Sequence, residues 1–169
     1  RRHFIDMEFG QMSSKYLYNI SQYKSILKQR NQYLKQLQRR QAKDLVYLGV
    51  LSDQLAAYGA EVTVARRQFL QQMEKWAQKL HQEITKDREV LTFKYQSQIP
   101  EEQLDQSVEE LYQQFQTLYE KQQTREVEQG TTLIGPHRDD VQFLVNDKDV
   151  QAFGSQGQQR TTALRSEER

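Results

Sequence analysis

Cysteine is absent from the 169 residues of this chain, and only two prolines and seven glycines are present. Without cysteine the chain cannot build disulfide frameworks, thiolate zinc sites or cysteine nucleophiles, and the absence fits a reducing, cytoplasmic setting. Long hydrophobic runs are also absent, because the longest, 45–51, is far shorter than the roughly 20 residues that span a bilayer. We therefore expect a soluble cytoplasmic protein with no membrane partner and no export signal.

Charge and composition favour an extended helical body. The 24 lysines and arginines balance 23 acids, so the net charge argues neither for nor against a polyanionic partner. Hydrophobic residues make up 36%, below the roughly 45–50% of an average globular chain, while glutamine occurs 28 times. This composition suits an elongated helical protein better than a compact sphere.

The hydrophobic pattern predicts two helices in the first third of the chain. Apolar residues recur at alternating spacings of four and three over 14–41, which predicts a long helix with a narrow, coiled-coil-like seam. Only Arg30 interrupts this seam. A second helix is predicted over 42–57, with Gly59 as its C-terminal stop.

Two further helices are predicted beyond Gly59. The first ends near Asp87, and the second begins at Pro100, with acids in its first turn, and continues to Gly130. The seam of the first consists of Val64, Phe69, Met73, Trp76, Leu80 and Ile84. Between these helices, β-forming residues over 89–98 predict a short strand.

The chain changes character at Gly130. Glycines become more frequent, and the glutamine-rich helical pattern gives way to short β-forming runs at 131–134 and 141–145. These runs predict two strands, with turns at 135–136 and 146–147.

Together these elements predict a mainly α fold, in which an antiparallel helical, coiled-coil-like lobe is followed by a short β-hairpin. The helical lobe is expected over 1–129, with a lead-in segment over 1–10. The second part, 130–169, is too small to fold alone.

Charge is segregated between the first and the last predicted helix. No acid occurs between Phe9 and Lys43, whereas 99–129 carries eight acids against two cations. A basic helix interleaved with tyrosines suits phosphates and unpaired bases. Its candidate DNA contacts are Lys24, Lys28, Arg30, Lys35, Arg39, Arg40 and Lys43, with Tyr16, Tyr18, Tyr23 and Tyr33 for stacking. The alternative is that the basic and acidic helices pair with each other, since complementary charge sets register in coiled coils.

One tight turn concentrates chemically capable side chains, namely Gly135, Pro136, His137, Arg138, Asp139 and Asp140. A general base, a cation and two carboxylates could form a metal or hydrolytic site. However, adjacent carboxylates point apart at the start of a strand, and no second ligand cluster of similar density occurs elsewhere. A hydrogen-bonded structural turn is the simpler interpretation, so we predict neither catalytic residues nor metal ligands.

A second motif, 153–160, combines two glycines and a hydroxyl with a helix-compatible sequence directly after them. Such a helix start presents backbone N–H groups to an anionic phosphate, but the same pattern is also an ordinary turn and helix cap. No Gly-x-x-x-x-Gly-Lys-Ser/Thr loop occurs in the sequence, so the chain cannot build a phosphate cradle unaided.

The two motifs together resemble the bacterial RecF family of DNA repair proteins. The order is Gly135-Pro136-His137-Arg138-Asp139-Asp140 and, about fifteen residues later, Ser155-Gln156-Gly157-Gln158-Gln159-Arg160-Thr161. Similar segments at 1–6, 27–31 and 58–60 extend the resemblance over nearly the whole chain, to about Leu164. The family is an ABC-type ATPase family related to SMC proteins, so the resemblance implies that 130–164 belongs to an incomplete α/β ABC-type ATPase lobe with a signature helix.

By this resemblance, the ATP signature comprises Ser155, Gln156, Gly157, Gln158, Gln159 and Arg160. In the family, the signature of one subunit contacts the γ-phosphate of ATP that the Walker A loop of the other subunit holds, so ATP drives homodimerisation around DNA. The resemblance implies ATP and Mg as cofactors of the intact parent, with single-stranded or gapped DNA, RecO and RecR as partners. It also implies roles in recombination, replication, repair and the SOS response.

Parts of the family pattern are missing from this sequence. The Walker A loop would precede Arg1 and the Walker B segment would follow Arg169, so we expect a central fragment of a weak ATPase that binds no cofactor and is inactive alone. Residues 165–169 also depart from the aliphatic helix expected after the signature. The alternative function is a helical protein–protein interaction module without DNA or nucleotide binding of its own.

Overall fold

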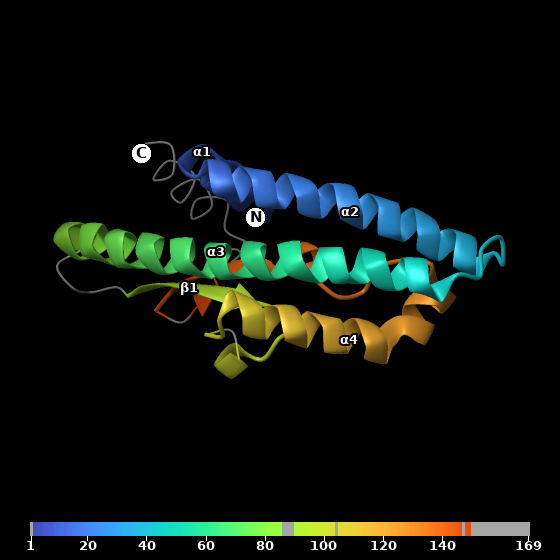
Figure 1. Ribbon diagram of the computed structural model, residues 1–169. Coiled ribbons are helices and arrows are strands. Elements are labelled where there is room, and N and C mark those ends of the chain that lie inside the picture. The colour runs from blue at the N-terminus through green and yellow to red at the C-terminus, as the bar shows by residue number, and fades with distance from the viewer. Residues whose placement is uncertain (1, 86–89, 104, 147, 150–169) are drawn as a thin grey trace. The chain divides into compact units, whose positions relative to one another are not determined.

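The computed structural model describes residues 2–85, 90–103, 105–146 and 148–149. Its elements are α1 (Arg2–Met12), α2 (Ser14–Gln38), α3 (Leu45–Thr85), β1 (Leu91–Gln96), the 3₁₀ turn η1 (Glu101–Gln103), α4 (Val108–Gln129), the 3₁₀ turn η2 (Pro136–Arg138), β2 (Asp140–Val145) and β3 (Lys148–Asp149). The predicted mainly α fold with long antiparallel helices is confirmed (Figure 1). None of the helices in the described ranges has the length and apolar character needed to cross a membrane.

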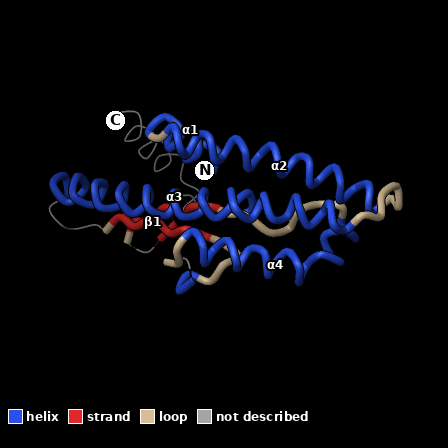
Figure 2. The backbone as a smooth tube through the Cα atoms, in the orientation of Figure 1, coloured by secondary structure: helices blue, strands red, loops and turns tan. Residues whose placement is uncertain are grey.

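The chain forms two compact units. The first consists of the described residues up to Arg67 together with Ser97–Asp140, and the second of Gln68–Gln96 together with the described residues from Val141 onward. In the first unit, α2 and the N-terminal part of α3 form a helical hairpin, and α4 lies along the same part of α3 (Figure 2).

The core of the first unit is built from the inward faces of these three helices. The α2 seam is confirmed, since its buried residues include Tyr16, Ile20, Tyr23, Leu34 and Leu37. From α3 and α4 the core receives Leu48, Leu51, Leu55, Leu111 and Phe115. The helix α2 begins where the Ser13 hydroxyl accepts the Tyr16 N–H at 3.1 Å, which satisfies one of the free donors of its first turn.

In the second unit, the C-terminal part of α3 accompanies a small sheet with the strand order β1-β2-β3. The strands β2 and β3 are antiparallel, with Leu144 opposite Asp149 and Val145 opposite Lys148. The Phe93 N–H of β1 donates to the Glu74 carboxylate of α3 at 2.9 Å. The predicted strand within 89–98 is therefore present, and Asn146 lies in a turn directly after β2.

Gly59 does not end a helix, contrary to the prediction, because α3 runs without interruption from Leu45 to Thr85. A Cβ atom at this position would lie 3.2 Å from Cε2 of Tyr23 and 3.4 Å from Cδ of Pro136. The glycine therefore allows close packing against the middle of a helix.

The seam predicted for the later part of α3 does not coincide with the buried face of this helix. Three of its members are exposed, namely Trp76, Leu80 and Ile84. The buried face instead includes Arg66, Leu70, Ala77 and His81. Because Arg66 and His81 are polar, the hydrophobic spacing in the sequence does not indicate that this face is buried.

The last helix begins at Val108, not at Pro100 as predicted. A capping box fixes this start: the Ser107 hydroxyl accepts the Glu110 N–H at 3.2 Å, and the Glu110 carboxylate accepts the Ser107 N–H at 3.3 Å. The acids after Pro100 form only the short turn η1. The predicted end at Gly130 is confirmed by its left-handed φ of 66°.

The run 131–134 is not a strand, although its residues favour one. Side chains of α2 and α4 accept hydrogen bonds from its backbone N–H groups. Thr132 N–H donates to Asn31 Oδ1, and Leu133 N–H donates to Glu126 Oε2, both at 2.8 Å. The same N–H groups are therefore not available to pair with a neighbouring strand. The hairpin predicted for this part of the chain is formed by β2 and β3 instead.

Candidate nucleic-acid interface and its buried support

The motif 135–140 forms a 3₁₀ turn that leads into β2. The Arg138 N–H donates to the Gly135 carbonyl at 3.1 Å, and the Asp139 N–H donates to the Pro136 carbonyl at 3.2 Å. Asp139 is buried, whereas Arg138 is exposed. Gly135 has a φ of 135°, a backbone conformation that other residues rarely adopt.

His137 is held between two fixed partners in this turn. Its Nε2 lies 3.1 Å from the Thr132 carbonyl, which can only accept, so Nε2 carries the proton. Its Nδ1 therefore accepts from the Tyr23 hydroxyl at 2.7 Å. Burial lowers the pKa of His137 to about 4. A neutral imidazole with its lone pair occupied is poorly matched to general base catalysis near pH 7.

Acidification should destabilise the fold through His137. The folded pKa of about 4 lies below the ordinary 6.5, so the unfolded chain binds the proton more readily at intermediate pH. The stability due to the neutral ring is fully present above about pH 6.5 and is lost as the pH falls toward 4, a loss on the order of 2 kcal/mol.

Urea unfolding at several pH values between these limits measures the effect. His137→Gln should flatten the pH dependence, whereas His3→Gln, at an exposed position of α1, should leave it as in the original chain. An unflattened His137→Gln profile would assign the dependence to other groups.

A buried arginine of α3 supports the turn from one side. Arg66 forms a bidentate ion pair with Asp6 of α1, with N–O distances of 3.0 and 2.9 Å, and the Tyr16 hydroxyl donates to the same carboxylate. Arg66 Nη1 also donates to the Pro136 carbonyl at 2.7 Å. Burial raises the pKa of Tyr16, so the phenol keeps its proton. The turn is thereby tied to α1, α2 and α3.

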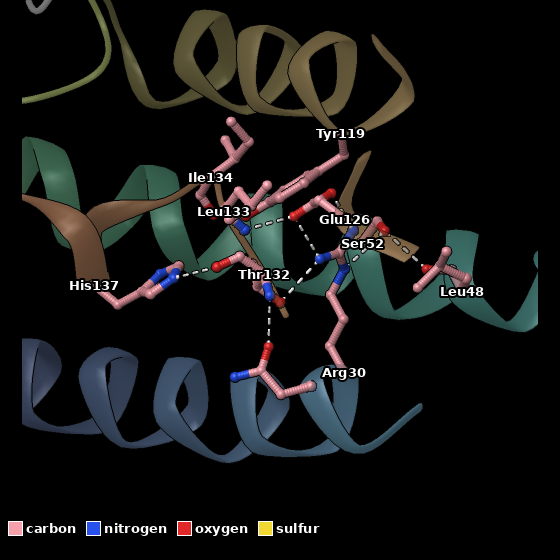
Figure 3. Close-up of polar contacts among 10 residues, drawn as sticks. Arg30, Leu48, Ser52, Tyr119, Glu126, Thr132, Leu133, Ile134 and His137 are labelled. Atoms are coloured by element: carbon pink, nitrogen blue, oxygen red, sulfur yellow. Dashed lines mark hydrogen bonds and ion pairs between the residues drawn. The ribbon is translucent and has the colours of Figure 1, made fainter. Parts of the chain in front are cut away.

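A second buried arginine supports the segment before the turn (Figure 3). Arg30 of α2 and Glu126 of α4 are both 0% exposed and form a bidentate ion pair, with N–O distances of 3.0 and 2.9 Å. The guanidinium also donates to the Thr132 hydroxyl at 2.9 Å and to the Ser52 hydroxyl at 3.1 Å. It lies 4.6 Å from the centre of the Tyr119 ring. This cluster joins three helices to the backbone that enters the turn.

The burial of Arg30 corrects its place among the candidate DNA contacts, because its side chain cannot reach a phosphate from this position. The sequence does indicate this burial. Arg30 occupies a seam position of its helix, and a cation that faces the core there requires a buried anion as its partner. The other pair, Arg66 with Asp6, was missed, because nothing in the sequence links two single charges that lie 60 positions apart.

The remaining six candidate cations form a free basic surface. All are exposed, and none makes an ion pair with another described residue: Lys24, Lys28, Lys35, Arg39, Arg40 and Lys43. The spacing of four, seven and four residues from Lys24 to Arg39 places four cations on one face of α2 and its C-terminal cap. At about 1.5 Å per residue, this face is about 22 Å long.

Pairing between the basic α2 and the acidic α4 does not consume these cations. Within the described ranges, Arg30 with Glu126 is the one ion pair that joins the two helices. Two of the tyrosines predicted for base stacking, Tyr16 and Tyr23, are buried, whereas Tyr18 is 56% exposed. Tyr16 and Tyr23 are therefore removed from the tyrosines predicted to stack on bases.

The predicted ATP signature, 155–160, lies outside the described residues. Among the residues that are described, no three His, Asp or Glu side chains are grouped so as to hold a metal ion.

Comparisons with known proteins point to one family. No family model matches the chain. The chain is 99% identical over 164 residues to the DNA replication and repair protein RecF of Latilactobacillus sakei, a match that covers 97% of this chain and 44% of that protein. The RecF protein of Limosilactobacillus reuteri is 62% identical, with the same two shares covered.

The fold agrees with this relationship. A solved structure of the recombination mediator protein RecF-ATPrS in the RecFOR pathway matches with a TM-score of 0.86 at 27% identity, over 97% of this chain and 43% of that one. The chain therefore spans less than half the length of the relatives it matches. The resemblance to the RecF family is thereby confirmed, and it holds for the segment of a RecF protein that this chain spans.

Proposed function

We propose that this chain serves as the central segment of a RecF-type recombination mediator that acts in DNA repair and replication, and that its contribution is to bind DNA through the basic face of α2. The observation that carries the proposal is the set of six exposed cations without an ion-pair partner among the described residues. Such cations gain affinity by displacing counterions from nucleic-acid phosphates.

The dimensions of the basic face fit a nucleic-acid backbone. One strand of a duplex carries one phosphate per about 3.4 Å of helix axis, so a face about 22 Å long that lies along the duplex spans several of them. Lys and Arg side chains at this face need no rearrangement of the core to reach a phosphate. The position of Arg30 behind the face keeps α2 in place.

The role of ATP in the proposal rests on the resemblance alone. The signature residues Ser155, Gln156, Gly157, Gln158, Gln159 and Arg160 would contact, in trans, the γ-phosphate of the ATP that a second subunit binds, with Mg as a further cofactor of the intact parent. We further propose that ATP-dependent homodimerisation, cooperation with RecO and RecR, the SOS response and a cytoplasmic location apply to the intact parent. The helical lobe of this proposal is 1–129, and the part belonging to the ATPase lobe is 130–169.

Salt dependence of DNA binding tests the proposed interface. The chain is titrated with single-stranded and gapped duplex DNA at several salt concentrations, with and without glutamine at Lys24, Lys28, Lys35 and Arg39. Each lost phosphate contact should reduce the slope of log affinity against log salt by about 0.7–0.9. Loss of all four contacts should therefore weaken binding and flatten the slope.

Lys15→Gln is the matched control. Lys15 is an exposed cation of the same helix, but it lies 4.0 Å from the carboxylate of Glu61 and not on the basic face. It should leave the slope unchanged. An unchanged slope in the quadruple variant would favour the other candidate function, a helical protein–protein interaction module.

A further inference from the structure

The tip of the helical hairpin carries an exposed apolar surface, here called the tip patch, that consists of Leu45, Val46, Tyr47 and Val50. Their side chains are 53, 77, 43 and 49% exposed. All four lie in the first turns of α3. Contiguous exposed apolar side chains of this kind commonly mark an interaction surface.

The tip patch is held on a well-anchored scaffold. Asp44 Oδ1 accepts the Val46 N–H at 2.9 Å and so caps the start of α3. The Tyr33 hydroxyl donates to the Asp44 carbonyl at 2.6 Å, and the Tyr33 and Tyr47 rings meet edge to face at 4.6 Å. Beneath them, α2 and α3 share a small apolar core around Leu34, Leu37 and Leu48. The patch is therefore presented by ordered helix.

Opposite charges lie at the two ends of the tip patch. Three exposed cations, Arg39, Arg40 and Lys43, precede it together with one acid, Asp44, whose carboxylate is occupied by the Val46 and Tyr47 N–H groups, so this end carries a net positive charge. Beyond it, exposed Asp53 and Glu120 line a groove of about 240 Å³ that also reaches Leu45 and Gly49. The Asp53 carboxylate accepts from the Tyr112 hydroxyl and from the Gln116 amide, which hold it in place.

We infer that the tip patch binds the tip patch of a second copy of this chain, with the two α3 helices antiparallel. A two-fold axis near position 48 places Val46 opposite Val50 of the other copy, and Lys43 opposite Asp53 of the other copy. Because a two-fold contact uses the same surface twice, each copy supplies a positive end and a negative end. The net charges of the two ends favour this arrangement over a parallel one, which brings like charges together.

Two further features fit this occupant. A Cβ atom at Gly49 would meet nothing within 4 Å, so the surface is open where the second helix must approach. The acids Asp53 and Glu120 disfavour an anionic lipid surface, which would otherwise suit an apolar patch beside cations. The contact needs no nucleotide and uses none of the signature residues, so it is separate from the ATP-dependent dimer proposed above.

The tip patch has four residues, fewer than the roughly 20–30 that each partner contributes to a stable interface, so we expect a weak, concentration-dependent dimer. Sedimentation equilibrium of the 169-residue chain without nucleotide or DNA measures it. Val50→Asp should yield monomers at every concentration. Lys43→Asp and Asp53→Lys should each weaken dimerisation by about tenfold or more, and the double variant should restore it, because the charges are exchanged on both copies.

The absence of cysteine allows a direct test of the axis. Gly49→Cys, close to the proposed two-fold axis, should form a covalent dimer under mild oxidation, whereas Lys28→Cys, at an exposed position away from the patch, should not. Circular dichroism checks that each variant keeps its helices. Monomers at all concentrations, or dimers that survive Val50→Asp, would overturn the inference. So would binding of a monomeric chain to phosphatidylserine vesicles that Val50→Asp abolishes, since the patch would then be a lipid surface.

Discussion

Arg30→Met is expected to lower the free energy of unfolding by about 3–5 kcal/mol, because it leaves the buried Glu126 carboxylate without its charge partner. The same substitution removes the donors to the Thr132 and Ser52 hydroxyls and the cation above the Tyr119 ring. Among the described residues, the Leu133 N–H alone would still donate to Glu126. Urea denaturation followed by circular dichroism measures the loss.

Two further variants separate the ion pair from the packing of its side chains. Arg30→Met combined with Glu126→Leu should recover most of the lost stability, since apolar residues of similar volume can replace a buried ion pair at little cost. Lys28→Met removes the same charge from the exposed face of α2 and should change stability by no more than about 0.5 kcal/mol. Equal losses for Arg30→Met and Lys28→Met would show that the buried pair does not support the fold.

The sequence predicted the helices well where a single hydrophobic face determines which residues are buried. The seam of α2 and the glycine stop of α4 follow directly from spacing and backbone freedom. The same logic failed at Gly59, because its role depends on Tyr23 and Pro136, which approach from other parts of the chain. Local chemistry predicted the helix end at Gly130, but it did not distinguish a helix stop from close packing between distant segments at Gly59.

In the candidate site, too, some features could be predicted from the local sequence, whereas others depend on the tertiary fold. The turn 135–140 could be located from its residues, and Arg30 could be suspected of burial from its place in a seam. Its partner could not be identified, since 99–129 offers eight acids and the sequence does not distinguish Glu126 among them. The two buried arginines meet their anions at separations of 60 and 96 residues. Only the tertiary fold brings such pairs together.

Gly135→Ala is expected to destabilise the chain by about 2–5 kcal/mol, as the sum of backbone strain and overpacking. The φ of 135° lies where a side chain is strained whatever the surrounding space. A Cβ atom would also lie 2.1 Å from the Tyr23 hydroxyl oxygen and 3.1 Å from His137 Nδ1. The substitution would therefore push apart the Tyr23–His137 hydrogen bond that closes the turn.

Two other glycines of the same chain provide a graded control. Gly59→Ala should cost less than Gly135→Ala, because its Cβ would be 3.2 Å from the Tyr23 ring without backbone strain. Gly49→Ala should stabilise the chain by about 0.5–1 kcal/mol, since the site is an open helix position and alanine is the better helix former. Urea unfolding of the three variants, at concentrations low enough to keep the chain monomeric, should rank them in this order. A Gly135→Ala variant as stable as Gly49→Ala would mean that the turn can open away from Tyr23 at no cost, and that the contacts of Arg66 and His137 do not fix its conformation.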